Sequence, residues 1–369
     1  MYDFDDSRVY TRLVVLNSAE AALELLEKRA ALYSDRPPVT MIKDPALMNW
    51  PDNAVTIGYN EIWRHYRRTM NVWLNKHSVA QYNDLQDRQA QLLLQQLLLA
   101  MDHEQPFEHV KNEILFTVGS SMLQLAYGYE PKSPEDHFLK EVQSTIHNVV
   151  SAAMQTNFLV NLFPALLHVP NWFPGTGWKR TGRERGVQQN KAKTEPYEWL
   201  RAQIADGTHQ PSLLSFLLQD YELLTGLNLE EQDKRLKEIG IALFGAGTDS
   251  TASLVANFVA TMVLNPRIQA RAQLELDTVL GWAVLPRISD QCPGMHFAEA
   301  PVFITVASLL ATFTFTKKQD SNGEDIIPQI EAERNSIAYE LKPFDFQFKP
   351  RSEEHRQLIL GTNIDEEQG

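Results

Sequence analysis

Cysteine is almost absent from this chain: Cys292 is the only one among 369 residues. An intrachain disulfide and a zinc site built from several cysteines are therefore excluded. A lone cysteine is most often an unreactive core residue, but it can also act as a nucleophile or as a single metal ligand. Any thiolate chemistry in this protein must use this one side chain.

Other familiar signals are missing as well. The net charge of −13 argues against nucleic acid as a partner, because binding phosphates requires a basic face. No stretch approaches the run of about 18 apolar residues that a membrane span needs, and the acidic N-terminus is unlike a signal peptide. The sequence holds no His-Glu-x-x-His, Gly-x-Ser-x-Gly or P-loop motif. Gly245-Ala-Gly247 is only half of a dinucleotide-binding fingerprint, and it lies inside a helical pattern.

The stretch from Glu238 to Val263 has helical length and is apolar nearly all round. Such a pattern predicts a helix buried through the middle of a large domain. A Thr-Asp-Ser-Thr sequence at 248–251 interrupts it, and burying an acid and three hydroxyls costs free energy unless these groups are satisfied or used. This polar insert is therefore the first candidate for a functional site.

Two readings of the insert are open from the residues alone. Ser250 and Thr251 can each bond back to the carbonyl four residues earlier, which bends helices, and Gly245 and Gly247 would let a bulky planar partner approach the backbone. A bent turn beside Asp249 could then hold a water, a small molecule and a proton path. Alternatively, the hydroxyls only donate hydrogen bonds to backbone carbonyls of their own helix, and Asp249 pairs with a group on a neighbouring helix.

Elsewhere the periodicity predicts mostly helices, with a few short strands near the ends. Asn17 and Glu20 form a capping box for a helix that reaches Leu32, with Ala22, Leu25, Leu26 and Leu32 inward. Further helices are predicted at Asn60–Trp73, Gln81–Met101, Glu113–Tyr127, Thr194–Ile204, Pro211–Leu223, Arg267–Leu280 (Ala270, Leu274 and Val279 inward) and Ala298–Phe313. Strands are predicted at Arg8–Leu16, Phe313–Lys318 and Ala338–Phe348, with a turn at Asp320–Gly323.

The segment Asn157–Trp178 is rich in apolar and aromatic residues, which suggests a mobile lid or a membrane-dipping loop.

The basic helix at Asn60–Trp73 carries Trp63 and Arg67 four residues apart, and hence on one face. An indole N–H and a guanidinium fork can together hold a carboxylate. Taken by itself, the pattern favours the simpler interpretation of a solvated basic helix with one Trp in the core.

The insert resembles a motif of the cytochromes P450. Ala246-Gly247-Thr248-Asp249-Ser250-Thr251 is similar to the Ala/Gly-Gly-x-Asp/Glu-Thr-Thr/Ser signature of that family's long central helix, which crosses one face of the haem. The resemblance implies that Ala246 and Gly247 lie against the haem, and that Asp249 with Ser250 (or Thr251) relays protons. It also implies that Trp63 and Arg67 grip a haem propionate, because the family carries Trp-x-x-x-Arg there.

Near the single cysteine the resemblance is incomplete. Cys292-Pro-Gly294 is similar to the end of the family's cysteine loop, which implies that Cys292 is the axial thiolate ligand of the iron. The rest of the Phe-x-x-Gly-x-Arg-x-Cys-x-Gly signature is missing, since Leu285, Ile288 and Asp290 stand at its Phe, Gly and Arg positions. The helix with Glu-x-x-Arg is absent too. We therefore expect a single domain over 1–369 with an internal deletion between Gln291 and Cys292.

The resemblance implies a mainly α, P450-like fold with small β-sheets, incomplete on the proximal side of the haem. It implies a haem-thiolate monooxygenase of the fungal microsomal type, acting on a small apolar organic substrate with O2. Electrons would come from NADPH through NADPH-cytochrome P450 reductase. The family resides at the endoplasmic-reticulum membrane; this chain shows no anchor, so we expect it to be soluble or in peripheral membrane contact. A truncated, catalytically impaired derivative is the alternative, and an unrelated helical scaffold is a third.

Overall fold

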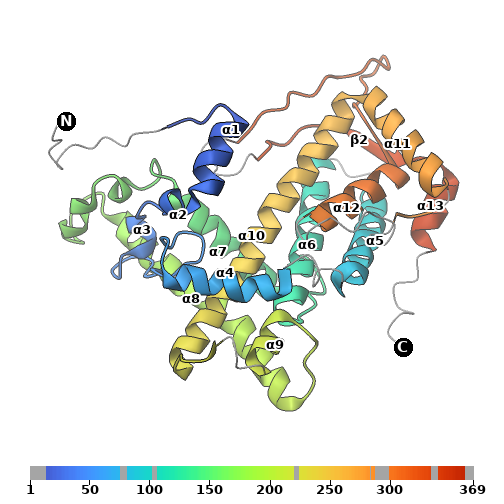
Figure 1. Cartoon of the computed structure of the whole chain (residues 1–369). Coiled ribbons are helices and arrows are strands. Elements are labelled where there is room, and N and C mark those ends of the chain that lie inside the picture. Colours follow the sequence, from blue (N-terminus) through green and yellow to red (C-terminus); the bar gives the residue numbers. More distant parts are fainter. Residues whose placement is uncertain are drawn as a thin grey trace.

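The computed structural model of the chain describes residues 14–74, 81–101, 106–219, 224–282, 284–286, 299–333 and 340–361. It is built mainly of helices gathered around α10 (Leu229–Leu264), which runs obliquely through the whole molecule (Figure 1). The other helices are α1 (Ala19–Ala22), α2 (Ala30–Tyr33), α3 (Thr40–Lys43), α4 (Glu61–Leu74), α5 (Asn83–Leu99), α6 (Pro106–Tyr127), α7 (His137–Ala153), α8 (Gly177–Asp206), α9 (Leu213–Gln219), α11 (Pro266–Leu280), α12 (Glu299–Thr312) and α13 (Glu353–Leu360). A π-helical turn (Leu23–Lys28) joins α1 to α2, and 3₁₀ turns occupy Leu159–Asn161 and Pro164–His168.

Local sequence explains where α10 begins and ends. The Asn228 side chain caps it by accepting a hydrogen bond from the backbone N–H of Glu231 at 2.9 Å. Two glutamates in the first turn complement the positive end of the helix dipole. Pro266 cannot continue the same helix and instead opens α11.

Contrary to the prediction, one apolar stretch does meet the length and composition of a membrane span. It lies in α10, the single such helix in the part of the chain that the structure describes, and 56% of that apolar window is buried inside the fold. Burial against other helices is the environment of a core helix, and we interpret α10 as one.

Two clusters of buried side chains meet along α10. The larger one contains residues of α3, α6, α7, α8, α9 and the first half of α10. The second lies around α5, the second half of α10, α12 and the sheet, where the rings of Phe313, Phe315 and Phe346 each contact the ring of Phe348. The helix therefore belongs to both halves of the core, as the sequence predicted for a helix that is apolar nearly all round.

A single antiparallel sheet is present among the described residues. It pairs β1 (Phe313–Thr316) with β2 (Gln347–Pro350), so that Phe313 faces Pro350 and Thr316 faces Gln347. The buried amide of Gln269 on α11 accepts a hydrogen bond from the N–H of Phe315 and donates one to its carbonyl, both at 2.9 Å. These bonds fix α11 against the edge of the sheet.

The predicted helices from α4 onward are confirmed, although several bounds shift. Thr194–Ile204 is part of the 30-residue α8, which continues through Pro196, and α6 begins earlier, at Pro106. Strand β1 and the turn at Asp320 are also confirmed: the Asp320 carboxylate accepts from the backbone N–H groups of Asn322 and Glu324. The second strand is shorter than predicted, because regular pairing begins only at Gln347.

Four predictions near the N-terminus and on α11 differ from the structure. The cap of α1 is Ser18, which accepts from the N–H of Ala21, and not Asn17. Leu26 and Leu32 are 58% and 73% exposed, so this first helix does not bury the predicted face. Residues 14–16 form no strand, and the rest of the predicted first strand lies outside the described residues. On α11, Leu274 and Val279 are exposed while Gln269 is buried, because its amide is satisfied by the sheet.

Candidate functional site

A cleft of about 920 Å³ runs along one face of α10. From α10 it is lined by residues three or four apart that share this face, namely Glu238, Ala242, Gly245, Ala246, Asp249, Ser253 and Ala256. The opposite walls come from α7 (Ile146, His147, Val150), α6 (Phe107, Lys111, Leu115), the segment Trp50–Val55, and Glu333, Glu340 and Leu341. Its size and mixed lining are typical of small-molecule sites.

Asp249 is half-buried in this cleft. Burial raises the pKa of its carboxyl, and the negative charge of Glu340 adds to the rise, while His147 and Lys111 oppose it. The Lys111 ammonium is itself paired with the Glu340 carboxylate at 2.5 Å. Asp249 therefore holds a proton more readily than an exposed aspartate does.

The two hydroxyls after Asp249 have different environments. Ser250 lines the cleft, and its hydroxyl donates to the carbonyl of Ala246 at 2.7 Å, as predicted. Thr251 is buried on the other side of the helix, does not line the cleft, and forms no bond to the carbonyl of Gly247. Thr248 is completely buried, and its hydroxyl has no hydrogen-bond partner among the described residues.

The helix is not opened at the insert, and this part of the prediction is wrong. α10 continues unbroken through 246–251. The space beside its glycines is filled by neighbouring helices: a Cβ atom on Gly245 would meet Cδ1 of Ile146 at 2.5 Å, and one on Gly247 would collide with the sulfur of Met122. These glycines therefore allow close helix packing. Gly245 still borders the cleft and Gly247 does not, so most of the uncovered surface is offered by Ala246, Asp249 and Ser250.

Trp63 and Arg67 lie on one face of α4 as the spacing predicted. The Asn60 side chain caps the helix by accepting from the Trp63 N–H at 2.9 Å, and the Arg67 guanidinium lies over the Trp63 ring at 5.2 Å from its centroid. The pair does not line the cleft along α10. Cys292 and Gly294 lie outside the described residues, so the structure brings together Ala246, Asp249 and Ser250 but does not place the cysteine loop.

Sequence reasoning missed a buried charged group at one end of the cleft. The Glu238 carboxylate, 1% exposed, accepts one hydrogen bond from the Trp50 indole N–H at 2.6 Å and another from the Lys193 ammonium at 2.7 Å. Burial raises the pKa of Glu238, and the charge of Lys193 opposes that rise. The sequence did carry a signal, since an isolated acid stands at the start of the apolar stretch; its partners lie 45 and 188 residues away.

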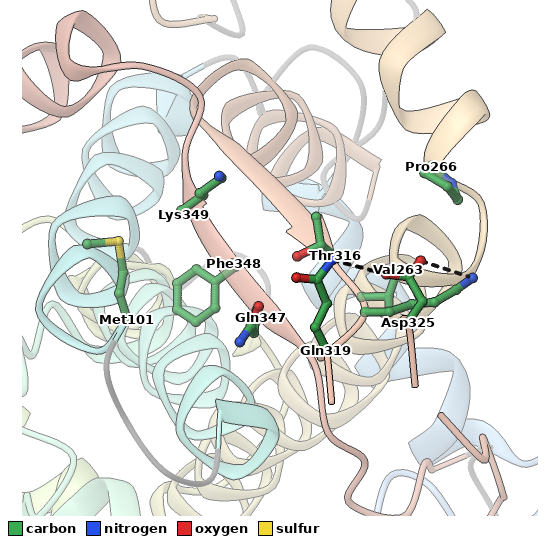
Figure 2. Close-up of a pocket in the computed structure, with 10 residues that line it drawn as sticks. Met101, Val263, Pro266, Thr316, Gln319, Asp325, Gln347, Phe348 and Lys349 are labelled. Carbon is green, nitrogen blue, oxygen red and sulfur yellow. Dashed lines mark hydrogen bonds and ion pairs between the residues drawn. The ribbon is translucent and has the colours of Figure 1, made fainter. Parts of the chain in front are cut away.

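A second, smaller cleft of about 430 Å³ lies beside the sheet (Figure 2). It is bordered by Met101 after α5, by Val263 and Pro266 where α10 gives way to α11, and by residues of both strands. None of the predicted site residues lies in it, and we assign it no role.

The long buried helix, its acid and hydroxyl, and the cleft beside them are the features that the resemblance to the cytochrome P450 class predicted. The chain belongs to this family: the cytochrome P450 family model matches residues 8–291. A cytochrome P450 monooxygenase of Armillaria gallica is 30% identical over 78% of this chain and 56% of its own length. Cytochrome P450 monooxygenase 98 of Postia placenta is 32% identical over 95% of this chain and 84% of its own.

A solved structure of similar fold is a zebrafish cytochrome P450 with progesterone. It matches with a TM-score of 0.66 at 14% identity, over 90% of this chain and 92% of that one. At this identity the likeness shows the fold alone. The mainly α, P450-like fold predicted from the sequence is confirmed.

The described residues fit the distal side of a haem. In the middle of a core helix, Ala246 and Ser250 are exposed, and Asp249 is only half-buried, because the cleft leaves their face of α10 uncovered. The Ala246 side chain is a single methyl group, the smallest obstacle that a chiral residue offers to a flat ligand. The proximal side, where Cys292 would stand, lies outside the described residues.

Proposed function

We propose that this chain derives from a haem-thiolate monooxygenase, which inserts one oxygen atom of O2 into a small apolar organic substrate. The observation that carries the proposal is the cleft on α10, where the motif residues Ala246, Asp249 and Ser250 lie side by side along one wall. The electrons would come from NADPH through a cytochrome P450 reductase. The chain spans 56% of the Armillaria relative, so the activity of the whole protein is part of the proposal.

A haem would be held by residues from three parts of the chain. Cys292 would be the axial thiolate, with Gly294 giving the backbone of its loop. Ala246 would form the distal wall, whereas Gly247 lies outside the cleft and faces Met122. Trp63 with Arg67 would bind a propionate. When bound, the haem would supply the redox-active iron needed to activate O2.

The protein's own groups would manage protons at this wall. Burial raises the pKa of Asp249, so its carboxyl takes up a proton more readily than an exposed aspartate does and would be suited to pass one into the cleft. The Ser250 hydroxyl donates to the Ala246 carbonyl, so its oxygen is left to accept a proton or a hydrogen bond from the cleft side. Because Ser250 lines the cleft and Thr251 does not, we assign the alcohol role to Ser250.

We propose in addition that the chain is one domain with an internal deletion between Gln291 and Cys292, and is a poor catalyst for that reason. The family match stops at residue 291. The alignment with the Postia relative spans 446 positions, whereas 95% of this chain is about 350 residues, so about 95 positions have no residue of this chain. Val279, Trp282 and Val284 are 75%, 59% and 49% exposed, as expected where a covering segment is lost.

The deciding experiment is an absorbance spectrum of the purified, reduced chain under carbon monoxide, together with its haem content. We expect substoichiometric haem, a red-shifted band that Cys292→Ala abolishes, and turnover near background. Inserting the Glu-x-x-Arg helix and the sheet segment of a close relative before Cys292 should restore haem content and turnover. A Cys292→Ala variant that keeps the band would refute the ligand assignment. Full haem loading with brisk turnover by the unmodified chain would refute the impaired-derivative proposal.

We propose a peripheral membrane contact through the loop between α7 and α8. Leu159, Phe163, Trp172 and Phe173 there are 60%, 44%, 81% and 51% exposed. Co-flotation with phospholipid vesicles tests this, and replacing Trp172 and Phe173 together by serine should abolish it. Equal flotation of the two proteins would contradict the proposal.

A further inference from the structure

The cleft along α10 carries a charged group at one end and the motif acid further along. Glu238 and Asp249 are eleven residues apart, so they lie about three turns, or about 16 Å, from each other along the helix. Eleven residues at about 100° each also bring them back to the same face, and both line the cleft. Between them this face is formed by small residues, Ala242, Gly245 and Ala246.

The walls opposite this stretch are largely apolar. Ile146, Val149 and Val150 line the cleft from α7, together with the polar Gln143 and His147, and Ile241 lines it from α10 itself. An elongated apolar molecule that lies along α10 would thus bury its length against these side chains. Its two ends would reach Glu238 and Asp249.

The Glu238 carboxylate is only partly satisfied. Each of its oxygens accepts one hydrogen bond, Oε2 from Trp50 and Oε1 from Lys193. A carboxylate offers about four lone-pair sites, so Glu238, which borders the cleft, keeps acceptor sites beyond these two bonds. Because the side chain is 1% exposed, a ligand donor reaches them only if the carboxylate turns toward the cleft. Lys193 also lies over the Trp50 ring, with its ammonium 5.2 Å from the centroid, and this second contact holds the group in place.

The charges of this group select the kind of donor. A carboxylate on the ligand would be repelled by Glu238, and an ammonium would be repelled by Lys193, which is only 2.7 Å from Glu238. A neutral hydroxyl meets neither repulsion, and its O–H can donate to the free lone pair of the buried carboxylate. Hydrogen bonds to a charged acceptor are roughly twice as strong as those between neutral groups.

We propose that Glu238 is a specificity-determining residue that accepts a hydrogen bond from a hydroxyl group at one end of an elongated apolar substrate. This inference rests on the proposed function, because it treats the cleft as the substrate site. The other end of the substrate lies against Ala246 and Ser250, so the carbon to be oxidised is the one most distant from the hydroxyl. The substrate class is therefore a long apolar alcohol.

Calorimetric titration of the purified chain with matched ligands tests this without any turnover. The probes are dodecan-1-ol, its methyl ether, which has the same chain but no donor, and dodecanoate. We expect the alcohol to bind about tenfold more tightly than the ether, as a hydrogen bond to a charged acceptor contributes, and dodecanoate to bind most weakly. Equal affinities of alcohol and ether, or no measurable binding of the alcohol, would overturn the proposal.

Glu238→Gln separates recognition from a purely structural role. It should reduce the preference for the alcohol over the ether to about threefold and leave the affinity for the ether unchanged. Glu113→Gln is the matched control, since Glu113 is also a buried acid but does not line the cleft. A Glu238→Gln variant that weakens alcohol and ether equally would mean that the acid only supports the fold. The carbon monoxide spectrum is independent of these ligands, so failure of the haem assignment would be seen separately.

Discussion

An alanine at Gly240 tests the packing of α10 against α6, on which the position of the cleft depends. A Cβ atom on Gly240 would lie 2.7 Å from Cζ of Tyr127 and 2.9 Å from Cδ1 of Leu214, and it would collide with the Tyr127 hydroxyl. The Tyr127 ring is 1% exposed and enclosed by the larger core cluster, so it cannot swing aside. The two helices would have to move apart.

The size of the effect follows from two opposing contributions. Overpacking a core costs about 1–3 kcal/mol, and replacing glycine by alanine inside a helix returns about 1 kcal/mol. The obstacle is a rigid ring, so the cost should be near the top of its range. We expect Gly240→Ala to lower the free energy of unfolding by about 2 kcal/mol.

Urea unfolding followed by far-ultraviolet circular dichroism measures this change. Gly177→Ala is the matched control, because no atom lies within 4 Å of a Cβ there, and it should be neutral or slightly stabilising. The Tyr127 hydroxyl is buried with no hydrogen-bond partner among the described residues. Tyr127→Phe should therefore recover part of the loss when combined with Gly240→Ala. If Gly240→Ala were as stable as Gly177→Ala, the close approach of the two helices would be refuted.

Three further predictions follow from single side chains. Burial raises the pKa of Asp249, so the native state binds its proton more tightly, and the free energy of unfolding falls as pH rises from 3.8 through the folded pKa. Asp249→Asn should remove this contribution to the fall of the urea midpoint with pH, and an unchanged dependence of the midpoint on pH would contradict the prediction. Arg67→Ala should reduce haem retention more than Arg68→Ala, because Arg68 is on another face of α4. Equal losses would favour the alternative that α4 is only a solvated basic helix. Lys179 is buried and donates to the carbonyls of Leu167 and Val169, both at 2.6 Å, so Lys179→Met should speed proteolysis of this loop, and an unchanged cleavage rate would count against its anchoring role.

The helices that the sequence predicted best carry both their periodicity and their caps in local residues. α4 begins after Asn60, whose side chain bonds the N–H of Trp63, as predicted. α10 has a cap of the same kind at Asn228, although the prediction placed the start of this helix nine residues later, at Glu238. These signals act over three residues, so they can be read without knowing the fold. The Trp63–Arg67 contact was predictable for the same reason, since helix geometry alone brings residues four apart together.

Predictions failed where a polar side chain is satisfied by a distant partner. Gln269 is buried because the backbone of Phe315, 46 residues later, bonds its amide. Glu238 is buried because Trp50 and Lys193 both donate to it. Periodicity places polar residues outward by default, and only the tertiary fold shows which of them have partners inside.

The glycines of the insert show a related limit. Gly245 and Gly247 do mark a place where something approaches the helix closely, as their lack of a side chain indicated. The sequence could not tell a ligand from a neighbouring helix, and the structure shows Ile146 and Met122 there. The candidate functional face is instead formed by residues whose exposure is unusual for a core helix, namely Ala246, Asp249 and Ser250.

The proposed deletion and the intact distal half are compatible because of how the core is divided. α10 closes both clusters of buried side chains, and α11 and α12 still pack on each other and on the sheet. Leu285, which follows α11, is buried in the second cluster, so the chain after α11 still enters the core. Removal of a segment between α11 and α12 would therefore leave the cleft on α10 standing. What it would remove is the support of Cys292, and a ligand without locked neighbours cannot hold the geometry that its chemistry needs.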